Sequence, residues 1–523
     1  MTHALLPLVA APGIQRDGTF FDSEACTDGV WCRFYKGRPR KIGGYRLIDS
    51  GNSEIARTLF GVPVGNNLEV YVGRKSSVSS FILDQNGIAS NEIDRTPIAE
   101  FVINDNNVWS FDVMPTILPG GIIESYIIAH VAPSGNDIGS QIEGPIFYGK
   151  INGTERLEPI YSTDTSLKGV QKSSGGICVS GNHLIKYGNG GAFFWTEPVK
   201  GDALSSILNW KVDNRQVGGS TKIVSATKTR GSNSETVFFL ALETNFRASW
   251  NPTENTFDVN IVDENSTILA SNSLISFQGM AAWQANGHYY LYNGAVQELK
   301  NDMNLRFFFG NLNYEAKEKI FGFYNAAYNE LWWVGPLNGA TECNHAVIYK
   351  VDANCWYDTP LDRAAAFQAK TYRFPIMSSS QPLNSVSSNN YPLWIHEEGA
   401  NAVIGGRVQA IPSWFETNPI MMGLGGDDSD YQLRVYRIEP DFKQTGDMYV
   451  QLVSRGFPQS TPIYSDPVYF PPNGEKVDFS VNGRIISVRF GSDEMDGFFQ
   501  CGKPLLDYGI KDSRGDARPS SHN

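Results

Sequence analysis

The stretch Asn286-Gly287-His288-Tyr289-Tyr290-Leu291-Tyr292-Asn293-Gly294 shows the unit from which most of this chain is built. It is a polar turn, a short strand of aromatic and aliphatic side chains, and a second turn. Similar units recur along the sequence at Asn66–Gly73, Ser125–His130, Gly181–Gly188, Ser234–Leu240, Asn329–Gly335 and Asn389–Ile395. Internal repetition of one small unit indicates a repeat architecture.

The spacing of these units favours one repeat fold. Their turns, at residues 67, 125, 182, 234, 286, 329 and 390, lie 43 to 61 residues apart. Propeller blades of four strands repeat at roughly 40 to 50 residues. We therefore expect a β-propeller of six or seven blades over residues 51–405. The alternative, a large sandwich of irregular strands, does not explain the spacing. The adjacent Trp332 and Trp333 also suit a propeller, because its blades are covered on both faces.

The sequence changes character on the C-terminal side of the repeats. Residues 365–390, rich in alanine, serine and asparagine, favour a loop or a short helix plus a loop. Longer alternating strands follow at Leu433–Ile438, Met448–Val453, Val477–Val481 and Arg484–Phe490. They predict an antiparallel β-sheet or sandwich domain over residues 406–510. The polar tail, residues 511–523, is expected to be mobile unless it is bound.

Composition agrees with an all-β chain. Of 523 residues, 51 are glycine and 27 proline, aromatics reach 12%, and charged residues only 19%, which favours short strands and tight turns over long amphipathic helices. No run of 18 apolar residues occurs, so we expect no membrane span. The start of the chain lacks the basic segment of a secretory signal. Its six cysteines form no Cys-x-x-Cys pair, and we expect them to be reduced and buried.

Residues 1–50 are expected to form an N-terminal hairpin or arm. The stretch from Gly29 to Tyr45 predicts two strand arms joined at Lys36-Gly37, and then a Gly43-Gly44 break. From Trp31 to Arg46 there is no acidic residue, although the whole chain has a net charge of −12. The basic residues of this arm are Arg33, Lys36, Arg38, Arg40, Lys41 and Arg46. Such an arm suggests docking on an acidic neighbour or a phosphate surface; the alternative is a solvated hairpin face.

Motifs that carry chemistry are scarce. We find no sialidase-type box, no Gly-x-Ser-x-Gly elbow, no phosphate-binding loop and no His-Glu-x-x-His. We therefore expect a structural protein that is not an enzyme and that needs no cofactor or metal. The paired carboxylates of a glycosidase remain open, since their pairing is spatial.

Two groups of side chains could bind a metal ion. Cys343, His345 and Cys355 could supply zinc ligands, but their spacing does not match the common sites. Asp427, Asp428 and Asp430 could hold calcium, although a solvated loop is the simpler interpretation. The histidines inside repeat strands, His183, His288 and His396, are expected to be core or interface residues.

The N-terminal stretch also resembles the signature of tail hub or nozzle proteins of short-tailed (podovirus-type) bacteriophages. The matching residues here are Pro12-Gly13, Trp31, Arg33, Phe34, Gly37, Gly43, Gly44 and Tyr45. Later segments also resemble segments of these proteins; they are Tyr349–Trp356 followed by Arg363, Tyr431–Asp441, Ser454–Gly456 with Pro458, and Arg489-Phe490. Such chains often end with a Trp-Arg pair and basic residues, whereas this chain has Asp496–Gln500 and Asp512–Asp516.

The resemblance implies a homohexameric ring in the virion tail, made in the host bacterial cytoplasm. The ring would lie below the portal and adaptor proteins of the head–tail connector. Genomic DNA would pass through its channel without sequence-specific binding, and an acidic body suits such a lumen because each neutralised phosphate adds affinity. Tailspikes or fibres would attach outside, and a needle or plug protein is a further implied partner. The alternative is a glycan-binding or glycan-hydrolysing propeller of a tailspike.

Overall fold

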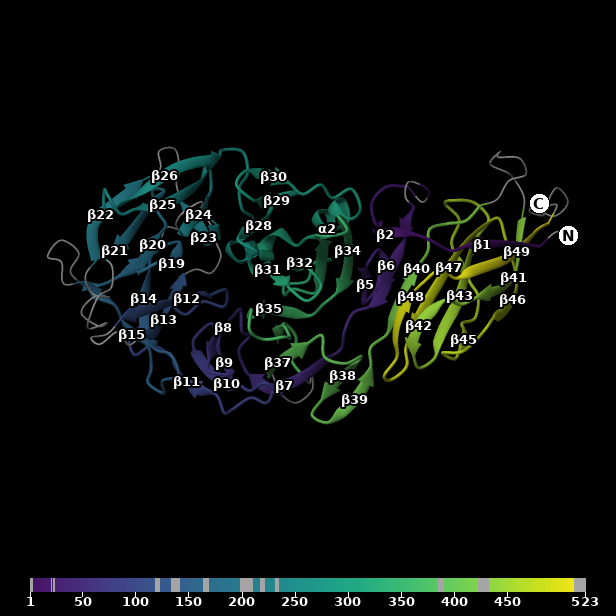
Figure 1. Cartoon of the computed structure of the whole chain (residues 1–523), viewed down its shortest axis with the longest axis horizontal. Coiled ribbons are helices and arrows are strands. Elements are labelled where there is room, and N and C mark those ends of the chain that lie inside the picture. The colour runs from purple at the N-terminus through teal and green to yellow at the C-terminus, as the bar shows by residue number, and fades with distance from the viewer. Residues whose placement is uncertain are drawn as a thin grey trace, which may run out of the picture.

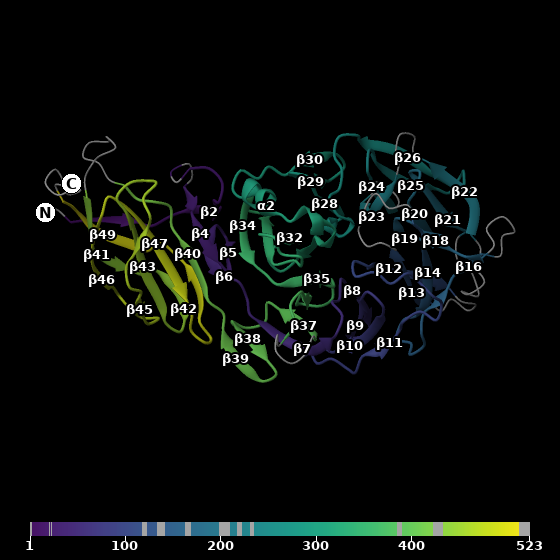
Figure 2. The same cartoon turned by 180° about the vertical axis from the view of Figure 1, so that it is seen from behind.

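A computed structural model describes residues 3–19, 21, 24–117, 123–132, 142–162, 169–197, 210–216, 222–230, 235–383, 390–421 and 432–511. The chain forms two β-structured parts that lie side by side, a ring of sheets and a sandwich (Figure 1). Seen from behind, the ring and the sandwich can again be told apart, and the first and last described strands, β1 (Ala4–Pro7) and β49 (Leu505–Lys511), pair with each other in the sandwich (Figure 2).

The ring is an antiparallel β-propeller. Among the described residues, seven sheets of four or more strands follow one another, and the fourth strand of the final sheet comes from the N-terminal segment. The first three sheets are β8 (Thr58–Val64), β9 (Asn67–Gly73), β10 (Val78–Leu83) and β11 (Ile93–Asp94); β12 (Val108–Ile117), β13 (Ile123–Ala132), β14 (Gly144–Lys150) and β15 (Glu158–Pro159); and β19 (Gly176–Ser180), β20 (His183–Tyr187), β21 (Ala192–Thr196) and β22 (Trp210–Gln216).

The next three sheets are β23 (Ile223–Arg230), β24 (Glu235–Ala241), β25 (Asn245–Asn251) and β26 (Thr256–Asp263); β27 (Ile275–Phe277), β28 (Met280–Ala285), β29 (His288–Tyr292) and β30 (Val296–Glu298); and β31 (Phe321–Asn325), β32 (Glu330–Gly335), β33 (His345–Lys350) and β34 (Cys355–Pro360). The seventh is β35 (Arg363–Phe367), β36 (Ile376–Ser379), β37 (Tyr391–His396) and β7 (Tyr45–Asn52), with β38 (Asn401–Ile404) and β39 (Arg407–Ala410) beyond β7.

Short elements complete this part of the chain. They are β16 (Tyr161–Ser162), β17 (Gly169–Val170), β18 (Lys172–Ser173), the 3-10 helices η1 (Ser271–Ser273) and η2 (Tyr314–Lys319), and the helix α2 (Leu305–Asn311). No helix among the described residues is long and apolar enough to cross a membrane.

The inner strand of each sheet packs on the inner strand of the next, and β35 packs back on β8, so the ring is closed. Six of the seven pairs of neighbouring sheets enclose an apolar cluster of their own, whereas the sixth and seventh sheets share theirs with the sandwich. Trp332 and Trp333 on β32 show why the sequence allows this: they point to opposite faces, Trp333 toward the fifth sheet and Trp332 into a cluster shared with the sandwich, and both are buried. The expected all-β propeller is therefore confirmed.

The repeat marks fall on equivalent but not identical strands. Five of them lie at the second strand of a sheet, whereas those at residues 286 and 390 precede β29 and β37, which are third strands. This explains the uneven spacing around residue 329. One expectation was wrong: residues 365–390 contain part of β35 and all of β36. β35 is the inner strand of its sheet, and its small alanines pack there. On the next strand, Ser378 donates a hydrogen bond to the carbonyl of Ala56 (2.6 Å), so this buried hydroxyl group has a partner.

The sandwich contains two main sheets. One has the order β1 (Ala4–Pro7), β49 (Leu505–Lys511), β41 (Gln432–Glu439) and β46 (Val477–Gly483). The other has the order β4 (Asp28–Val30), β40 (Ser413–Glu416), β47 (Ile485–Ser492) and β43 (Met448–Arg455), with β44 (Ile463–Tyr464) and β45 (Val468–Phe470) both pairing with β43. A smaller sheet has the order β42 (Phe442–Thr445), β48 (Phe498–Cys501), β6 (Arg38–Lys41) and β5 (Cys32–Tyr35).

The N-terminal segment is not a free arm. It adds β1, β4, β5 and β6 to the sandwich side, where β6 pairs with β48, and it also forms the short parallel pair β2 (Ala11–Ile14) and β3 (Ala25–Cys26). The boundary expected at residue 50 falls inside β7, which belongs to the propeller, and the boundary at 405 falls inside the β38–β39 hairpin. Asp427, Asp428 and Asp430, and the tail beyond Lys511, lie outside the described residues.

Candidate functional site: the junction of propeller and sandwich

The basic hairpin lies where the propeller meets the sandwich. Lys36 and Gly37 have φ angles of 51° and 74°, and Tyr35 pairs with Arg38 across them, so the expected two-residue turn is confirmed. Two residues of positive φ match the right-handed twist of the flanking strands. The turn places Arg33 on β5 toward the propeller.

Arg33 is buried completely and connects the sandwich side to two blades. Its Nη1 donates to Glu397 Oε2 (2.8 Å) and its Nη2 to Glu330 Oε2 (3.2 Å), and Nη2 also contacts Glu397 Oε1. Glu330 lies on β32, and Glu397 follows β37. The guanidinium lies 3.5 Å from the centre of the Tyr328 ring. One cation thus holds the sixth and seventh sheets to the hairpin.

The two carboxylates are themselves held by further donors. Tyr357 Oη donates to Glu330 Oε1 (2.6 Å) and Trp332 Nε1 to Glu330 Oε2 (2.9 Å). Glu397 accepts from the backbone amide of Gly43 (3.1 Å). Burial by itself would lower the pKa of Arg33, but Glu330 and Glu397 raise it above its ordinary value. The guanidinium of Arg33 is therefore permanently charged, and its network with Glu330 and Glu397 has a structural role.

The glycine pair of the N-terminal stretch is explained by close backbone approach. A Cβ on Gly44 would lie 2.3 Å from the carbonyl oxygen of Asn401, and one on Gly43 would lie 2.7 Å from the Cα of Glu397. Only glycine fits two positions where another segment of backbone passes so near. The chain passes this point directly before β7 begins at Tyr45.

The six basic residues of the arm have different surroundings. Lys41 is buried, and its Nζ donates to the carbonyl of Gly497 (2.8 Å); burial lowers its pKa to about 8. Arg46 pairs with Glu398 (3.0 Å). Together with Arg33, these cations are engaged within the chain and are not free to meet a partner. Arg33 and Arg46 form internal ion pairs and Lys41 a buried hydrogen bond, and the sequence did not reveal these partners.

The other three basic residues lie nearer the surface. Lys36 is exposed, while Arg38 and Arg40 are half-buried, with Arg40 packed between the rings of Tyr35 (5.0 Å) and Phe498 (4.8 Å). The docking hypothesis is therefore restricted to these three residues, and for them it stays a prediction.

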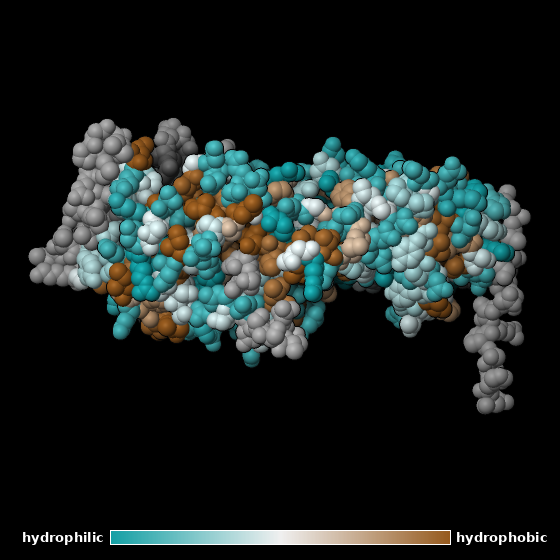
Figure 3. Space-filling model, turned by 90° about the horizontal axis from the view of Figure 1, so that it is seen from below, coloured by the Kyte–Doolittle hydropathy of each residue, from teal (hydrophilic) through white to brown (hydrophobic). Residues whose placement is uncertain are grey.

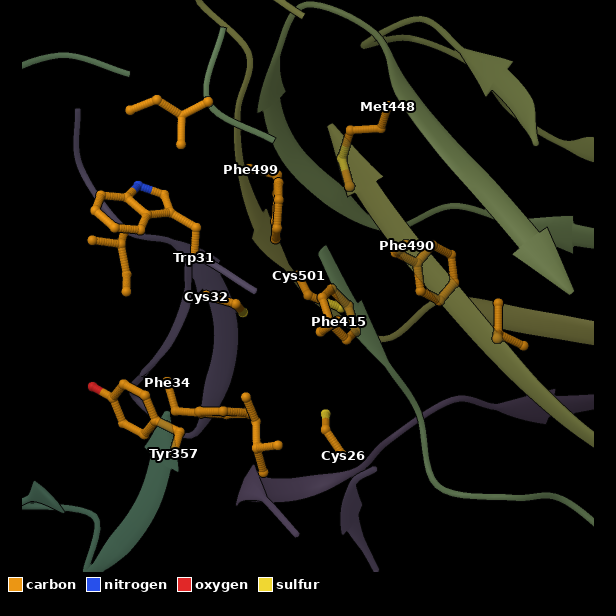
Figure 4. Close-up of a cluster of buried hydrophobic side chains, with 14 of the residues drawn as sticks. Cys26, Trp31, Cys32, Phe34, Tyr357, Phe415, Met448, Phe490, Phe499 and Cys501 are labelled. Atoms are coloured by element: carbon orange, nitrogen blue, oxygen red, sulfur yellow. The ribbon is translucent and has the colours of Figure 1, made fainter. Parts of the chain in front are cut away.

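Apolar residues of the junction join the two parts into one core. Figure 4 shows Phe34 facing Tyr357 of the propeller, with Phe415, Phe490 and Phe499 of the sandwich nearby. Cys26, Cys32 and Cys501 lie in this cluster, and burial raises the pKa of the Cys32 thiol to about 12. All six cysteines are buried and unpaired, which confirms the expectation for them.

A cavity at the propeller axis is a second place where a ligand could bind. It measures about 770 Å³ and is lined by the ends of β23, β27, β31 and β35. Its lining combines the aromatic Tyr324 and Phe367 with the amides of Gln278 and Gln368. Gln278 Nε2 donates to Tyr324 Oη (2.8 Å). Ligand sites of about 300–1,000 Å³ commonly have apolar walls and a few polar groups.

The zinc alternative does not match the geometry. Cys343 Sγ donates to the carbonyls of Lys319 and Val334, and His345 Nε2 lies 2.8 Å from Asp358 Oδ2. Within the described ranges, no cluster of three or more histidine, cysteine or acidic side chains is arranged to hold a metal.

The sequence did not reveal the partners of Arg33. Glu330 could have indicated a buried ion pair, because it is an acidic residue at the start of the apolar strand Leu331–Val334. A carboxylate in such a position is expected to have a buried partner.

Comparisons with known proteins gave no match in sequence and distant likenesses in structure. No protein-family model and no curated protein matches the chain. Among solved structures, it is similar to an exo-β-1,3-galactanase from Phanerochaete chrysosporium (13% identity, TM-score 0.30, covering 90% of this chain and 100% of that one). It is also similar to a fungal alcohol oxidase with copper (9%, 0.40, 90% and 99%) and to a candidate 6-phosphogluconolactonase from Bacteroides fragilis (12%, 0.38, 61% and 90%).

These comparisons correct one expectation. We expected a chain that is not an enzyme, whereas the solved structures similar to it are described as enzymes, so that expectation was wrong and is not kept. With identities of 13% or less, the likeness concerns the fold alone. No substrate is transferred from them to this chain.

Proposed function

We propose that this chain is a structural virion protein, the tail hub or nozzle of a short-tailed bacteriophage, and that six copies form a ring. One observation carries the proposal: the residues on which the resemblance depends form the junction. Trp31 donates from Nε1 to the carbonyl of Gly43 (3.2 Å), Arg33 ties two blades, and Gly44 lies against Asn401. The sequence signature thus describes how a propeller and a sandwich are joined.

The physical properties of the junction suit a rigid subunit of a ring. Buried ion pairs with several hydrogen bonds fix one geometry, because removing either partner leaves an uncompensated charge. A rigid two-part subunit can place the propeller and the sandwich at set distances from a channel. The net charge of −12 suits a lumen through which DNA passes without being held. Portal and adaptor, tailspikes or fibres, and a needle or plug are the partners that this proposal includes.

The axial cavity favours a second candidate, a glycan-binding tailspike component. A sugar ring could stack on the half-buried rings of Tyr324 and Phe367. Its hydroxyl groups could form hydrogen bonds with the side-chain amides of Gln278 and Gln368. Tailspikes are usually trimers, so this candidate predicts a different symmetry.

Particle mass and symmetry test the proposal. The purified full-length protein, alone and with its adaptor ring, would be measured by native mass spectrometry and imaged by electron microscopy. We expect six-fold particles with a central channel. A trimer that binds or cleaves glycans would support the second candidate, and a chain that stays monomeric in both preparations would contradict the ring.

A further inference from the structure

The outer edge of the sandwich carries an unusual group of exposed apolar side chains. Two short strands, β44 and β45, cap the edge of β43. Four of their five apolar residues are open to solvent, and the fifth, Phe470, is buried. The exposed fractions are 69% for Ile463, 46% for Tyr464, 37% for Val468 and 49% for Tyr469. Phe457, before β44, is 64% exposed. We name these five residues the strand patch.

The strand patch breaks the ordinary pattern of an edge strand. Successive side chains of a strand point to opposite faces, so a strand with one wet face alternates between apolar and polar residues. Ile463 and Tyr464 are both apolar and both exposed, and so are Val468 and Tyr469. From Thr461 to Pro472 the only charged residue is Asp466. Solvent-exposed edges normally carry charges that block pairing, so this edge has the composition of one that is covered on both faces.

A second uncharged edge lies on the other sheet of the sandwich. β1 is the end strand of its sheet, with β49 as its one neighbour. No charged residue occurs from Ala4 to Gln15, and Leu5 and Val9 are 52% and 46% exposed. We name Leu5 and Val9 the N-terminal patch.

The two patches lie on opposite flanks of the sandwich. β46 packs against β43 and β45, and β41 packs against β47, so the strand orders of the two sheets run in the same direction. β1 is therefore at the β4 flank, away from β44 and β45. Figure 1 shows β1 toward the upper side of the sandwich and β45 toward the lower side. Seen from below, brown apolar side chains break the teal surface over both parts of the molecule (Figure 3).

We propose that the strand patch of one copy packs on the N-terminal patch of the next copy, head to tail. This inference rests on the proposed ring and names the surface that closes it. Two different surfaces on opposite flanks of one subunit generate a ring when the rotation closes, whereas a two-fold dimer would need one self-complementary surface. Exposed apolar patches rimmed by polar residues mark such contacts.

A mixing experiment tests both the surface and its direction. Variant A carries Ile463→Asp and Val468→Asp, and variant B carries Leu5→Asp and Val9→Asp. A matched control carries Ile261→Asp, an equally exposed position (54%) on the outer strand β26 of the propeller. Thermal unfolding followed by circular dichroism confirms that each variant is folded. Assembly is measured by native mass spectrometry under the conditions in which the parent forms its ring.

We expect the control to form rings and variants A and B to be monomers when alone. When A and B are mixed, the intact N-terminal patch of A can meet the intact strand patch of B, so the mixture should give dimers and no larger species. Rings formed by A or B alone would overturn this contact while leaving the proposed function standing, and would indicate that the patches face an adaptor or fibre. Monomers in the mixture would overturn the head-to-tail pairing. A monomeric parent would contradict the ring itself and this contact with it.

Discussion

The propeller and the sandwich treat their strand edges in opposite ways. The propeller closes its ring by packing β35 on β8, and several of its outer strands are very short: β11 and β15 have two residues each and β30 has three. Radial repetition of this kind leaves only short, protected edges. In the sandwich, one edge of each sheet is instead an uncharged strand, β1 on one sheet and β44 with β45 on the other, whereas the opposite edges, β46 and β4, carry Asp478 and Asp28. The difference teaches that the propeller closes on itself, whereas the sandwich has two uncharged edges of the kind with which another chain can pair.

Arg33 gives the largest expected effect, because it ties these two parts together. Arg33→Met would leave Glu330 and Glu397 buried without their cation, and breaking a buried ion pair costs about 3–5 kcal/mol. Urea unfolding followed by tryptophan fluorescence should show this loss and two separated transitions. Arg38→Met, at a half-buried position of the same hairpin, is the control and should change stability by about 0.5 kcal/mol or less. A cooperative transition at the parent's midpoint would show that the tie is dispensable.

Gly44 gives the next effect. In Gly44→Ala the new methyl group would overlap the carbonyl oxygen of Asn401, and overpacking of this kind typically costs about 1–3 kcal/mol. Gly310→Ala is the matched control, since a Cβ at Gly310 in α2 meets no atom within 4 Å and alanine favours a helix. The midpoint of thermal unfolding should be lower for Gly44→Ala than for the parent, and for Gly310→Ala it should equal or exceed that of the parent. Equal midpoints for the two variants would contradict the close approach.

Lys41 gives the smallest effect, and it depends on pH. Its pKa in the folded chain is about 8, below its ordinary value of 10.5, because the ammonium is buried. Between these two values the unfolded chain binds more protons than the folded one, so the free energy of unfolding rises with pH. From pH 7 to pH 9 this contribution amounts to about 1 kcal/mol.

The measurement for Lys41 is a difference between two chains. Urea unfolding of the parent and of Lys41→Met at pH 7, 8 and 9 removes the contribution of all other groups. The parent should gain stability relative to the variant as the pH rises. A constant difference would show that Lys41 is charged and solvated in the folded chain.

The sequence predicted the propeller because its signal is local. Turn residues and alternating aromatic strands lie within each unit, so Asn286–Gly294 or Asn329–Gly335 can be recognised without knowing their neighbours. The expectation of a loop over residues 365–390 was wrong for the same reason. Serines and alanines favour a loop locally, and only the burial of those on β35 and β36 shows that they belong to a sheet.

The junction could be predicted only in part. The Lys36-Gly37 turn was visible, but the partners of Arg33 lie about 300 and 360 residues further along the chain. A run of basic residues looks the same whether its cations are solvated, as Lys36 is, or buried, as Arg33 and Lys41 are. Ion pairs between residues so far apart in the sequence form only when the ring is closed, and a local sequence pattern does not predict them.

The position of β7 sets an order of events during synthesis. β7 is made before the propeller, yet it pairs with β37, which joins Tyr45 to His396 across about 350 residues. At about 5–20 residues per second, the ribosome needs roughly 20 to 70 s to make the intervening chain. During that interval β7 has no partner strand, and contacts of such long sequence separation are slow to form. The nascent chain is therefore exposed to misfolding or to capture by chaperones until its final blade emerges.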